Sequence, residues 1–196
     1  MINKKFVEVI HNSCLMVFDK QVPGFRIIYK KEISNLFNER LAEKKLKTKN
    51  VQNPKVFDVY TYSMFRVFYK RLRDKGKIQL ILKFIGKKIY DAFKKKNKLT
   101  GNVKKDLAAL QKYFQRNKFY TTSQLTWADK KRFKHVINNP IIYEGARDIY
   151  TELGFSINLV SKVMEAYFNE YKLKVFEKHF NPYQQNHKIV EFWEFK

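Results

Sequence analysis

The chain of 196 residues is strongly basic, with 41 Lys and Arg against 18 Asp and Glu and a net charge of +23. Hydrophobic residues make up 44% of it and aromatic residues 16%, which excludes a disordered basic tail, because such tails lack the apolar material for a core. Only six Gly and four Pro are present, too few for a many-turned β-sandwich. We therefore expect a mainly α fold, a multi-helix bundle.

A charge of this size exceeds what solubility requires and implies a polyanionic partner. We expect nucleic acid first, DNA ahead of RNA, and an anionic membrane surface second. The charge is uneven: residues 66–98 hold thirteen basic and two acidic residues, whereas residues 141–196 hold seven basic and eight acidic ones. This step falls at the turn-prone Asn138-Asn139-Pro140. It predicts a basic helical domain over 1–139 and a near-neutral domain over 140–196.

Two helices are predicted in the first fifty residues. Apolar residues recur with helical spacing from Asn3 to Phe18, and the single cysteine, Cys14, lies on that stripe. One cysteine excludes an intramolecular disulfide, and on an apolar stripe we expect it to be a buried small hydrophobe. After a turn at 22–25, a second helix is predicted from about Lys31 to Lys47.

Residues 57–98 form the most basic stretch and are predicted to be two amphipathic helices joined at Gly76, which would take the left-handed conformation between them. The segment from Ile78 to Phe84 also alternates as a strand does, but the helical stripe continues to Phe93, so we expect helix. One side of each helix is apolar and the other carries cations. The cations expected to contact phosphate are Arg66, Lys70, Arg71, Arg73, Lys83, Lys87, Lys94 and Lys95.

A further basic helix is predicted after Asn97, with Thr100 or Asn102 as its cap. The segment 126–129, Thr-Trp-Ala-Asp, resembles a capping box and predicts another helix over the residues that follow. Trp127 is expected in the core, with a stacking surface as the alternative. This second helix adds four cations to the expected nucleic-acid-binding set, namely Lys130, Lys131, Arg132 and Lys134.

Residues 146–164 resemble the helix-turn-helix of DNA-binding proteins, with Leu153 ending the first helix and Ser156 capping the second. The segment departs from that pattern at Tyr150, where the motif has a small residue. An ordinary helical hairpin is the alternative, and the acidic residues around the segment favour it, because they repel phosphate. The positions that the resemblance assigns to the turn and the reading helix are Gly154, Ser156, Asn158, Ser161 and Lys162.

The same segment has a weaker, partial resemblance to the helical body of the HU and IHF architectural family. That resemblance implies a long helix from Ser156 to about Phe180, a short terminal β-strand over 187–195, and a helical body that mainly dimerises. The chain has no room for the β-arm with which that family grips the minor groove. We expect the aromatic C-terminus to dock a second copy or another protein.

No catalytic or metal-binding signature is present. The histidines His11, His135, His179 and His187 are far apart, and one cysteine does not make a zinc cluster. Phosphate-binding Gly-rich loops are also missing, so we expect no cofactor, no metal and no enzymatic activity. A nuclease built from scattered carboxylates is the remaining enzymatic alternative; the candidates are Asp58, Asp74 and Asp91.

The sequence thus favours a non-enzymatic protein that binds or packages DNA through backbone phosphates. The alternative is a viral or phage structural protein, such as a capsid or neck component that lies against packaged genome. No apolar run is long enough to span a bilayer, and no signal peptide is recognised. We expect a cytoplasmic location, or the virion if the chain is viral.

Overall fold

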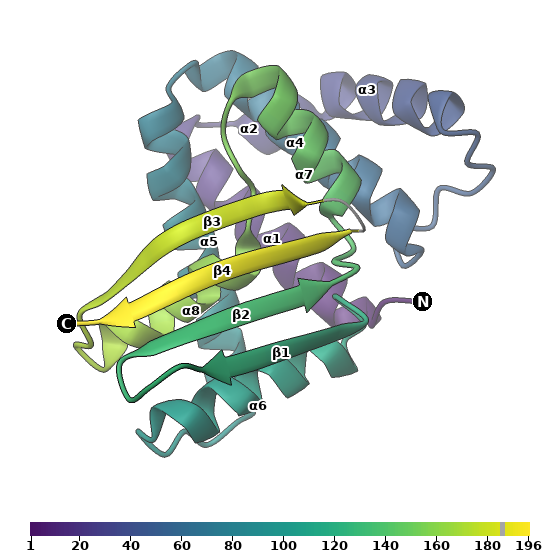
Figure 1. Ribbon diagram of the computed structural model, residues 1–196. Coiled ribbons are helices and arrows are strands. Elements are labelled where there is room, and N and C mark those ends of the chain that lie inside the picture. The colour runs from purple at the N-terminus through teal and green to yellow at the C-terminus, as the bar shows by residue number, and fades with distance from the viewer. Residues whose placement is uncertain (185–186) are drawn as a thin grey trace.

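The computed structural model describes residues 1–184 and 187–196, and it shows an antiparallel sheet with helices on one face (Figure 1). The helices are α1 (Lys4–Gln21), α2 (Phe25–Ile28), α3 (Lys30–Glu43), α4 (Pro54–Leu72), α5 (Lys75–Lys94), α6 (Val103–Arg116), α7 (Tyr143–Leu153) and α8 (Leu159–Glu170). The strands are β1 (Thr122–Trp127), β2 (Arg132–Asn138), β3 (Val175–Gln184) and β4 (Lys188–Phe195). The expected mainly helical character is confirmed, and so is a strand at the end of the chain.

The sheet is larger than the single terminal strand that the sequence indicated. Its strand order is β1-β2-β4-β3 and every neighbouring pair is antiparallel, so the last strand of the chain lies inside the sheet. In β2 the side chains alternate, with Phe133 and Ile137 buried and Lys134 exposed. The predicted bundle is therefore replaced by a layer of helices packed on a sheet.

The helix predicted after residues 126–129 is wrong, because this segment forms the β1–β2 hairpin. The side chain of Asp129 accepts hydrogen bonds from the backbone N–H groups of Lys131 and Arg132, at 2.7 and 2.8 Å. An Asp side chain that bonds the backbone two residues on makes a turn as readily as a helix cap. The apolar and polar residues alternate with period two from Phe133 through His135 to Ile137, and this alternation indicates a strand.

The two central helices are confirmed as α4 and α5, which rejects the strand alternative for residues 78–84. Their junction differs from the prediction. Arg73, with φ of 50°, is the left-handed residue that ends α4, and the side chain of Asp74 caps α5 by accepting from Lys77 N. Gly76 lies inside the first turn of α5, so it does not close a helix.

The long helix expected from Ser156 to about Phe180 is also wrong. α8 ends at Glu170, and Lys172 has a left-handed φ of 54°. The chain then enters β3, whose backbone pairs with β4. The pairing of these last two strands of the chain thus outweighs the helical pattern.

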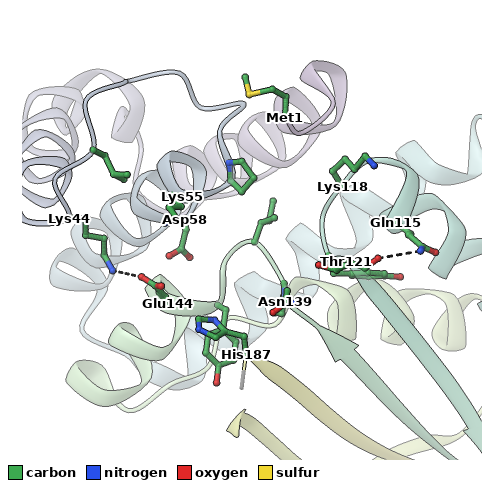
Figure 2. Close-up of a pocket in the computed structure, with 16 residues that line it drawn as sticks. Met1, Lys44, Lys55, Asp58, Gln115, Lys118, Thr121, Asn139, Glu144 and His187 are labelled. Atoms are coloured by element: carbon green, nitrogen blue, oxygen red, sulfur yellow. Dashed lines mark hydrogen bonds and ion pairs between the residues drawn. The ribbon is translucent and has the colours of Figure 1, made fainter. Parts of the chain in front are cut away.

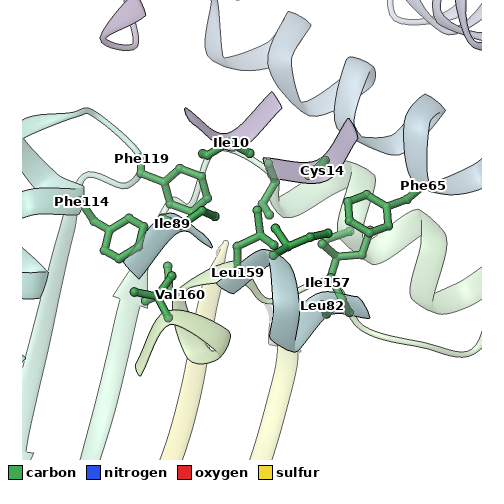
Figure 3. Close-up of a cluster of buried hydrophobic side chains, with 14 of the residues drawn as sticks. Ile10, Cys14, Phe65, Leu82, Ile89, Phe114, Phe119, Ile157, Leu159 and Val160 are labelled. Atoms are coloured by element: carbon green, nitrogen blue, oxygen red, sulfur yellow. The ribbon is translucent and has the colours of Figure 1, made fainter. Parts of the chain in front are cut away.

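One continuous hydrophobic core joins α1, α5, α8 and the sheet (Figure 3). It includes Ile10 of α1, Ile89 of α5 and Leu159 of α8, none of which exposes any side chain. Cys14 is buried there as expected, and burial raises the pKa of its thiol to about 12, so it stays protonated at neutral pH.

The division at residues 139 and 140 falls inside this architecture. β2, which precedes it, pairs with β4, which follows it, and the core contains residues from Ile2 to Trp193. The charge step that suggested two domains is a property of the surface, whereas the core and the sheet continue across it. No helix in the described part of the chain is long and apolar enough to cross a membrane.

Candidate functional site

The cations predicted on α4 face carboxylates that come from other helices. Lys70 and Arg71 both bond Glu32 of α3, at 2.9 and 2.7 Å. Arg66 forms an ion pair with Glu152 of α7 at 2.9 Å. The hydrogen bonds from Lys70 and Arg71 lower the pKa of Glu32, which keeps its carboxylate ionised at neutral pH.

Three of the cations predicted on α5 are neutralised in the same way, two of them by α8. Exposed pairs of this kind contribute little to stability, about 0–1 kcal/mol each, but each one occupies a cation that phosphate would otherwise meet. These acidic residues belong mainly to the near-neutral last quarter of the chain. The pairs are Lys83–Glu165 at 3.9 Å, Lys87–Asp91 at 3.1 Å and Lys94–Glu170 at 2.6 Å.

A second group of cations gathers at one end of the sheet, on the left in Figure 1, where the C-terminus lies. Five segments meet there: the loop after α5, the start of α6, the β1–β2 turn, the residues after α8 and the end of β4. The contacts that join them are Lys94 with Glu170 at 2.6 Å, Gly101 beside the ring of Tyr171, Lys104 Nζ 4.9 Å from the Trp127 ring, Phe195 N with Lys131 O at 2.8 Å, and Lys196 N with Lys174 O at 2.9 Å.

We call this surface the basic end. Its acidic side chains are few, and Asp129 is already paired with Arg132 at 2.7 Å. Eleven cations are exposed on it: Lys95, Lys96, Lys98, Lys104, Lys105, Lys130, Lys131, Arg132, Lys172, Lys174 and Lys196. Within the described ranges, nine of them have no carboxylate at ion-pair distance, namely Lys95, Lys96, Lys98, Lys104, Lys105, Lys130, Lys131, Lys172 and Lys174.

A buried carboxylate fixes the loop of the basic end. Asp106, which is 2% exposed, accepts hydrogen bonds from Thr100 N at 2.9 Å, Thr100 Oγ1 at 2.8 Å and Gly101 N at 2.9 Å. Tyr167 of α8 donates a fourth bond at 3.2 Å. Asn102 then caps α6 by accepting from Lys105 N. The lysines on this loop are therefore held on an ordered backbone.

The structure brings together only part of the predicted set. Lys95, Lys130, Lys131 and Arg132 lie at the basic end, and Lys94 borders it in its pair with Glu170, whereas the other predicted cations lie elsewhere. The α4 and α5 cations Arg66, Lys70, Arg71, Lys83 and Lys87 are ion-paired away from it, Arg73 is exposed at the end of α4, and Lys134 lies on the outer face of β2, with its Nζ 5.5 Å from the ring of Phe192.

The prediction had left several members of this surface outside the set. Four of them lie in a stretch that is visibly rich in lysine in the sequence, namely Lys96, Lys98, Lys104 and Lys105. Of the remaining three, Lys172 lies there because α8 ends at Glu170, and Lys174 and Lys196 meet through the pairing of β3 with β4, which the sequence did not reveal.

The helix-turn-helix segment has the expected outline. Gly154 is left-handed with φ of 69° and ends α7, and two helices flank the turn. The cap of α8 is Asn158, whose side chain accepts from Ser161 N at 3.2 Å, so Ser156 precedes the helix without capping it.

The second helix of this segment is not available to a DNA groove. Asn158 and Ser161 are only 5% and 1% exposed. On its other side α8 packs against Gly86 of α5 so closely that a Cβ there would lie 2.5 Å from the carbonyl carbon of Lys162. The side chain of Lys162 is 12% exposed and bonds Glu165. A reading helix must project from the protein, so this segment is a packed helical hairpin.

The aromatic side chains near the C-terminus are used inside the chain. Trp193 is 2% exposed and stacks on Phe133 at 6.2 Å, which leaves it unable to dock a partner. Trp127 is half-buried, with its ring stacked on Phe195 at 6.0 Å and Lys104 above it. Of the large apolar residues of β4, Phe192 is the exposed one, at 38%.

No metal centre or carboxylate cluster is found among the described residues: no group of three His, Cys, Asp or Glu side chains could hold an ion. The three carboxylates considered for a nuclease have separate roles. Asp74 caps α5, Asp91 pairs with Lys87 near the other end of that helix, and Asp58 bonds Gly145 N. The helical stretch between Asp74 and Asp91 spans about 25 Å, too far for a shared metal.

Comparisons with known proteins reach the fold and no further. No protein-family model matches the chain, and none of the curated proteins matches its sequence. A solved structure of trafficking protein particle complex subunit 3 from Naegleria fowleri, covalently bound to palmitic acid, is similar over 74% of this chain and 95% of that one, with a TM-score of 0.50 and 15% identity.

A mutant structure of the T. tengcongensis H-NOX is similar over 100% of this chain and 98% of that chain, with a TM-score of 0.50 and 12% identity. At identities this low, the structural similarity shows only a shared arrangement of helices and strands. They carry no ligand or activity over to this chain.

Proposed function

We propose that this chain binds nucleic acid, duplex DNA in the first place, by contacting backbone phosphates with its basic end. The observation that carries the proposal is the convergence of eleven exposed cations from five segments, nine of them without a carboxylate partner in the described part of the chain. Such a surface attracts the densely charged duplex by long-range electrostatics and by release of its counterions.

The chemistry of the surface favours contacts to phosphate over reading of bases. Ten of its eleven exposed cations are lysines, which meet phosphate as point charges and lack the planar fork with which Arg pairs with guanine. The packed α8 offers no helix for the major groove. Binding with little sequence discrimination follows, because phosphate contacts position a protein without distinguishing base pairs.

A salt titration tests the proposal directly. The full chain is titrated against labelled duplexes of two unrelated sequences by fluorescence anisotropy at several salt concentrations. The logarithm of affinity should fall linearly with the logarithm of salt, each neutralised phosphate adding about 0.9 to the slope, and the two duplexes should bind equally. Single-stranded DNA and duplex RNA of matched length rank the classes of nucleic acid.

Two outcomes would overturn the proposal. Binding that is absent, or that does not change with salt, would favour the alternative of a structural protein that docks an acidic protein partner. Tighter binding to vesicles of anionic lipid than to DNA would show that the basic end serves a membrane surface.

A further inference from the structure

β1 is an edge strand of the sheet, and one side of its backbone faces no other strand. Figure 1 shows it at the border of the sheet, with α6 running beside it. Its backbone pairs with β2 alone, in a register without a shift from Thr122 to Trp127. Residues at alternate positions of such a strand direct their N–H and C=O groups to opposite sides, so half of these groups point outward from the sheet.

The hydrogen bond that closes the β1–β2 turn shows which groups point outward. Ala128 N donates to Arg132 O at 2.9 Å, so the residues bonded to β2 are those at every second position before Ala128. The outward groups therefore belong to Ser123, Leu125 and Trp127. None of these N–H and C=O groups has a partner within the part of the chain that the structure describes. β1 thus presents a row of free donors and acceptors.

The other edge of the sheet has features that β1 lacks. Natural sheets keep their edge strands from pairing with other chains by means of bulges, prolines and charged residues. The register of β3 against β4 shifts twice, and the sequence of β3 includes Glu177, Lys178 and Pro182. β1 reads Thr-Ser-Gln-Leu-Thr-Trp, without a proline, a charged residue or a shift in register. One edge therefore resists strand pairing, whereas the other is open to it.

The side chains of β1 that face the helices are incompletely covered. Leu125 and Trp127 pack on the hydrophobic core, but both are only half-buried. α6 lies along this strand, and at one end Gln115 of α6 donates to Thr121 O at 3.3 Å, the dashed line between these residues in Figure 2. An extended segment placed beside β1 would lie next to α6 and cover Leu125 and Trp127 further.

The surface beside this edge is basic. Between Val103 and Trp127 the chain has five basic residues, all exposed, and its one acidic residue, Asp106, is buried. Lys112 and Arg116 of α6 lie outside the basic end and form no ion pair within the described residues. Two copies of the chain joined through β1 would bring these cations together, and like charges across an interface are unfavourable. Charge complementarity therefore selects an acidic partner.

We propose that the free edge of β1 binds an extended acidic segment of another protein, which adds a further strand to the sheet. The backbone of that segment bonds the outward groups of Ser123, Leu125 and Trp127, and its carboxylates meet Lys112 and Arg116. Strand addition takes its affinity from main-chain hydrogen bonds and its specificity from alternate side chains. This interaction goes beyond nucleic-acid binding, because Lys112 and Arg116 are not part of the basic end.

The probe is a blocked synthetic peptide in which Val and Glu alternate over the length of β1, labelled and titrated against the full chain by fluorescence anisotropy. It should bind about tenfold more tightly than the same peptide with Lys in place of Glu. A peptide with Pro in place of Val keeps the charge but cannot form a strand, so it should bind far more weakly. Equal binding of the Pro peptide would show that charge alone attracts the segment, and would overturn the proposal.

Amide hydrogen exchange of the full chain shows where the peptide binds. In the free chain the amides of Thr122, Gln124 and Thr126 are protected by β2, whereas the three outward amides should exchange rapidly. Saturating Val–Glu peptide should slow exchange of the outward amides about tenfold or more. Protection of these amides without peptide, increasing with protein concentration, would show that a second copy occupies the edge.

Variants of the edge separate strand pairing from other effects. Ser123→Pro removes one outward N–H and no bond to β2, so affinity for the Val–Glu peptide should fall about tenfold. Ser123→Ala is the matched control, because it loses the same hydroxyl, which accepts from Gln111 Nε2 at 3.0 Å, but keeps the N–H. It should bind the peptide as the native chain does. Lys112→Gln should weaken the peptide about two- to fivefold, whereas Lys174→Gln at the basic end should leave its affinity unchanged.

The proposal is wrong if the Val–Glu peptide does not bind at millimolar concentration, or if Ser123→Pro binds it as tightly as Ser123→Ala. Should Ser123→Pro fail to fold, the exchange pattern of the native chain and the Lys112→Gln variant decide the question. Neither result bears on the nucleic-acid proposal, which the salt titration with DNA tests separately.

Discussion

The central helices and the basic end both hold many cations, but folding surrounds them differently. On α4 and α5, Lys70 and Arg71 share Glu32, and Lys94 is met by Glu170. At the basic end, Lys130 and Lys131 have no carboxylate at ion-pair distance in the described part of the chain. The density of Lys and Arg along a sequence therefore does not measure the positive charge that a folded surface offers to phosphate.

The difference follows from position in the fold. α4 and α5 lie among α3, α7 and α8, and the acidic residues of these helices come within reach of their cations. The basic end consists of turns and chain ends that lie beyond the last turns of α5 and α8. Few acidic side chains come within reach of its cations there. The near-neutral last quarter of the sequence thus supplies the carboxylates that meet Arg66, Lys83 and Lys94, while Glu32 of α3 meets Lys70 and Arg71.

The largest expected effect concerns the carboxylate that holds the basic end in shape. Asp106→Ala removes the acceptor of four hydrogen bonds and leaves the buried Tyr167 hydroxyl without its partner. The free energy of unfolding should fall by about 3–5 kcal/mol, and DNA affinity should fall as the lysine-bearing loop loosens. Urea denaturation measures the first. Asp91→Ala, which removes an exposed i, i+4 pair, is the control and should cost less than about 0.5 kcal/mol.

A smaller effect tests whether α8 is packed on α5 or is free to read DNA. Gly86→Ala puts a Cβ 2.5 Å from the carbonyl carbon of Lys162, so the helices must separate and stability should fall by about 1–3 kcal/mol. Gly76→Ala is matched to it in chemistry but sits in the exposed first turn of the same helix, where it should stabilise by about 0.5–1 kcal/mol. Equal effects at the two sites would remove the argument for a packed α8.

DNA affinity should distinguish the two regions when the same number of lysines is neutralised in each. Lys130→Gln combined with Lys131→Gln should weaken duplex binding about tenfold or more and reduce the salt slope by nearly two, because each lost phosphate contact removes about 0.9. The matched pair Lys83→Gln and Lys87→Gln should change affinity less than about twofold. Salt titrations of both double variants measure this. A larger loss from the α5 pair would reverse the comparison.

The smallest effect comes from releasing the cations of α4. Glu32→Gln should change stability by no more than about 1 kcal/mol, since its pairs are largely exposed. It should raise DNA affinity slightly, because Lys70 and Arg71 become available.

The pH dependence of the same site has a definite sign. The pKa of Glu32 is lowered in the folded state, so its contribution is present above the ordinary value of 4.5 and is lost as the pH falls below it. Unfolding at pH 7 and at pH 3 should therefore differ less in Glu32→Gln than in the native chain, and an equal difference would contradict the assignment.

Much of the helical layer could be predicted, because α1, α4, α5 and α6 each carry a stripe with a polar cap before it. The sheet was missed for physical reasons that local patterns do not contain. Asp129 bonds backbone N–H groups two and three residues on, which resembles a helix cap, and β3 is specified by its pairing with β4. β4 also pairs with β2, where His135 faces Glu191 56 residues later in the chain, and no local pattern reveals such a pairing.

The candidate surface was predicted in part for the same reason. Lys95, Lys130, Lys131 and Arg132 were predicted because charge runs are visible in the sequence. Which cations have a carboxylate partner depends on how the helices pack. Lys70 and Arg71 bond Glu32 because α3 packs against α4. No sequence pattern indicates that the carboxyl group of Asp58 is buried, because its burial beside Gly145 depends on how α4 packs against α7.

The central claim is that DNA contacts the basic end and leaves the central helices free, and footprinting of lysines tests it most directly. The full chain is acetylated briefly with and without duplex DNA, and each modified lysine is quantified by mass spectrometry. We predict strong protection of Lys95, Lys96, Lys98, Lys105, Lys130 and Lys131, with Lys70, Lys83 and Lys87 modified at unchanged rates. Protection of the α4 and α5 lysines with the basic end still reactive would contradict the account.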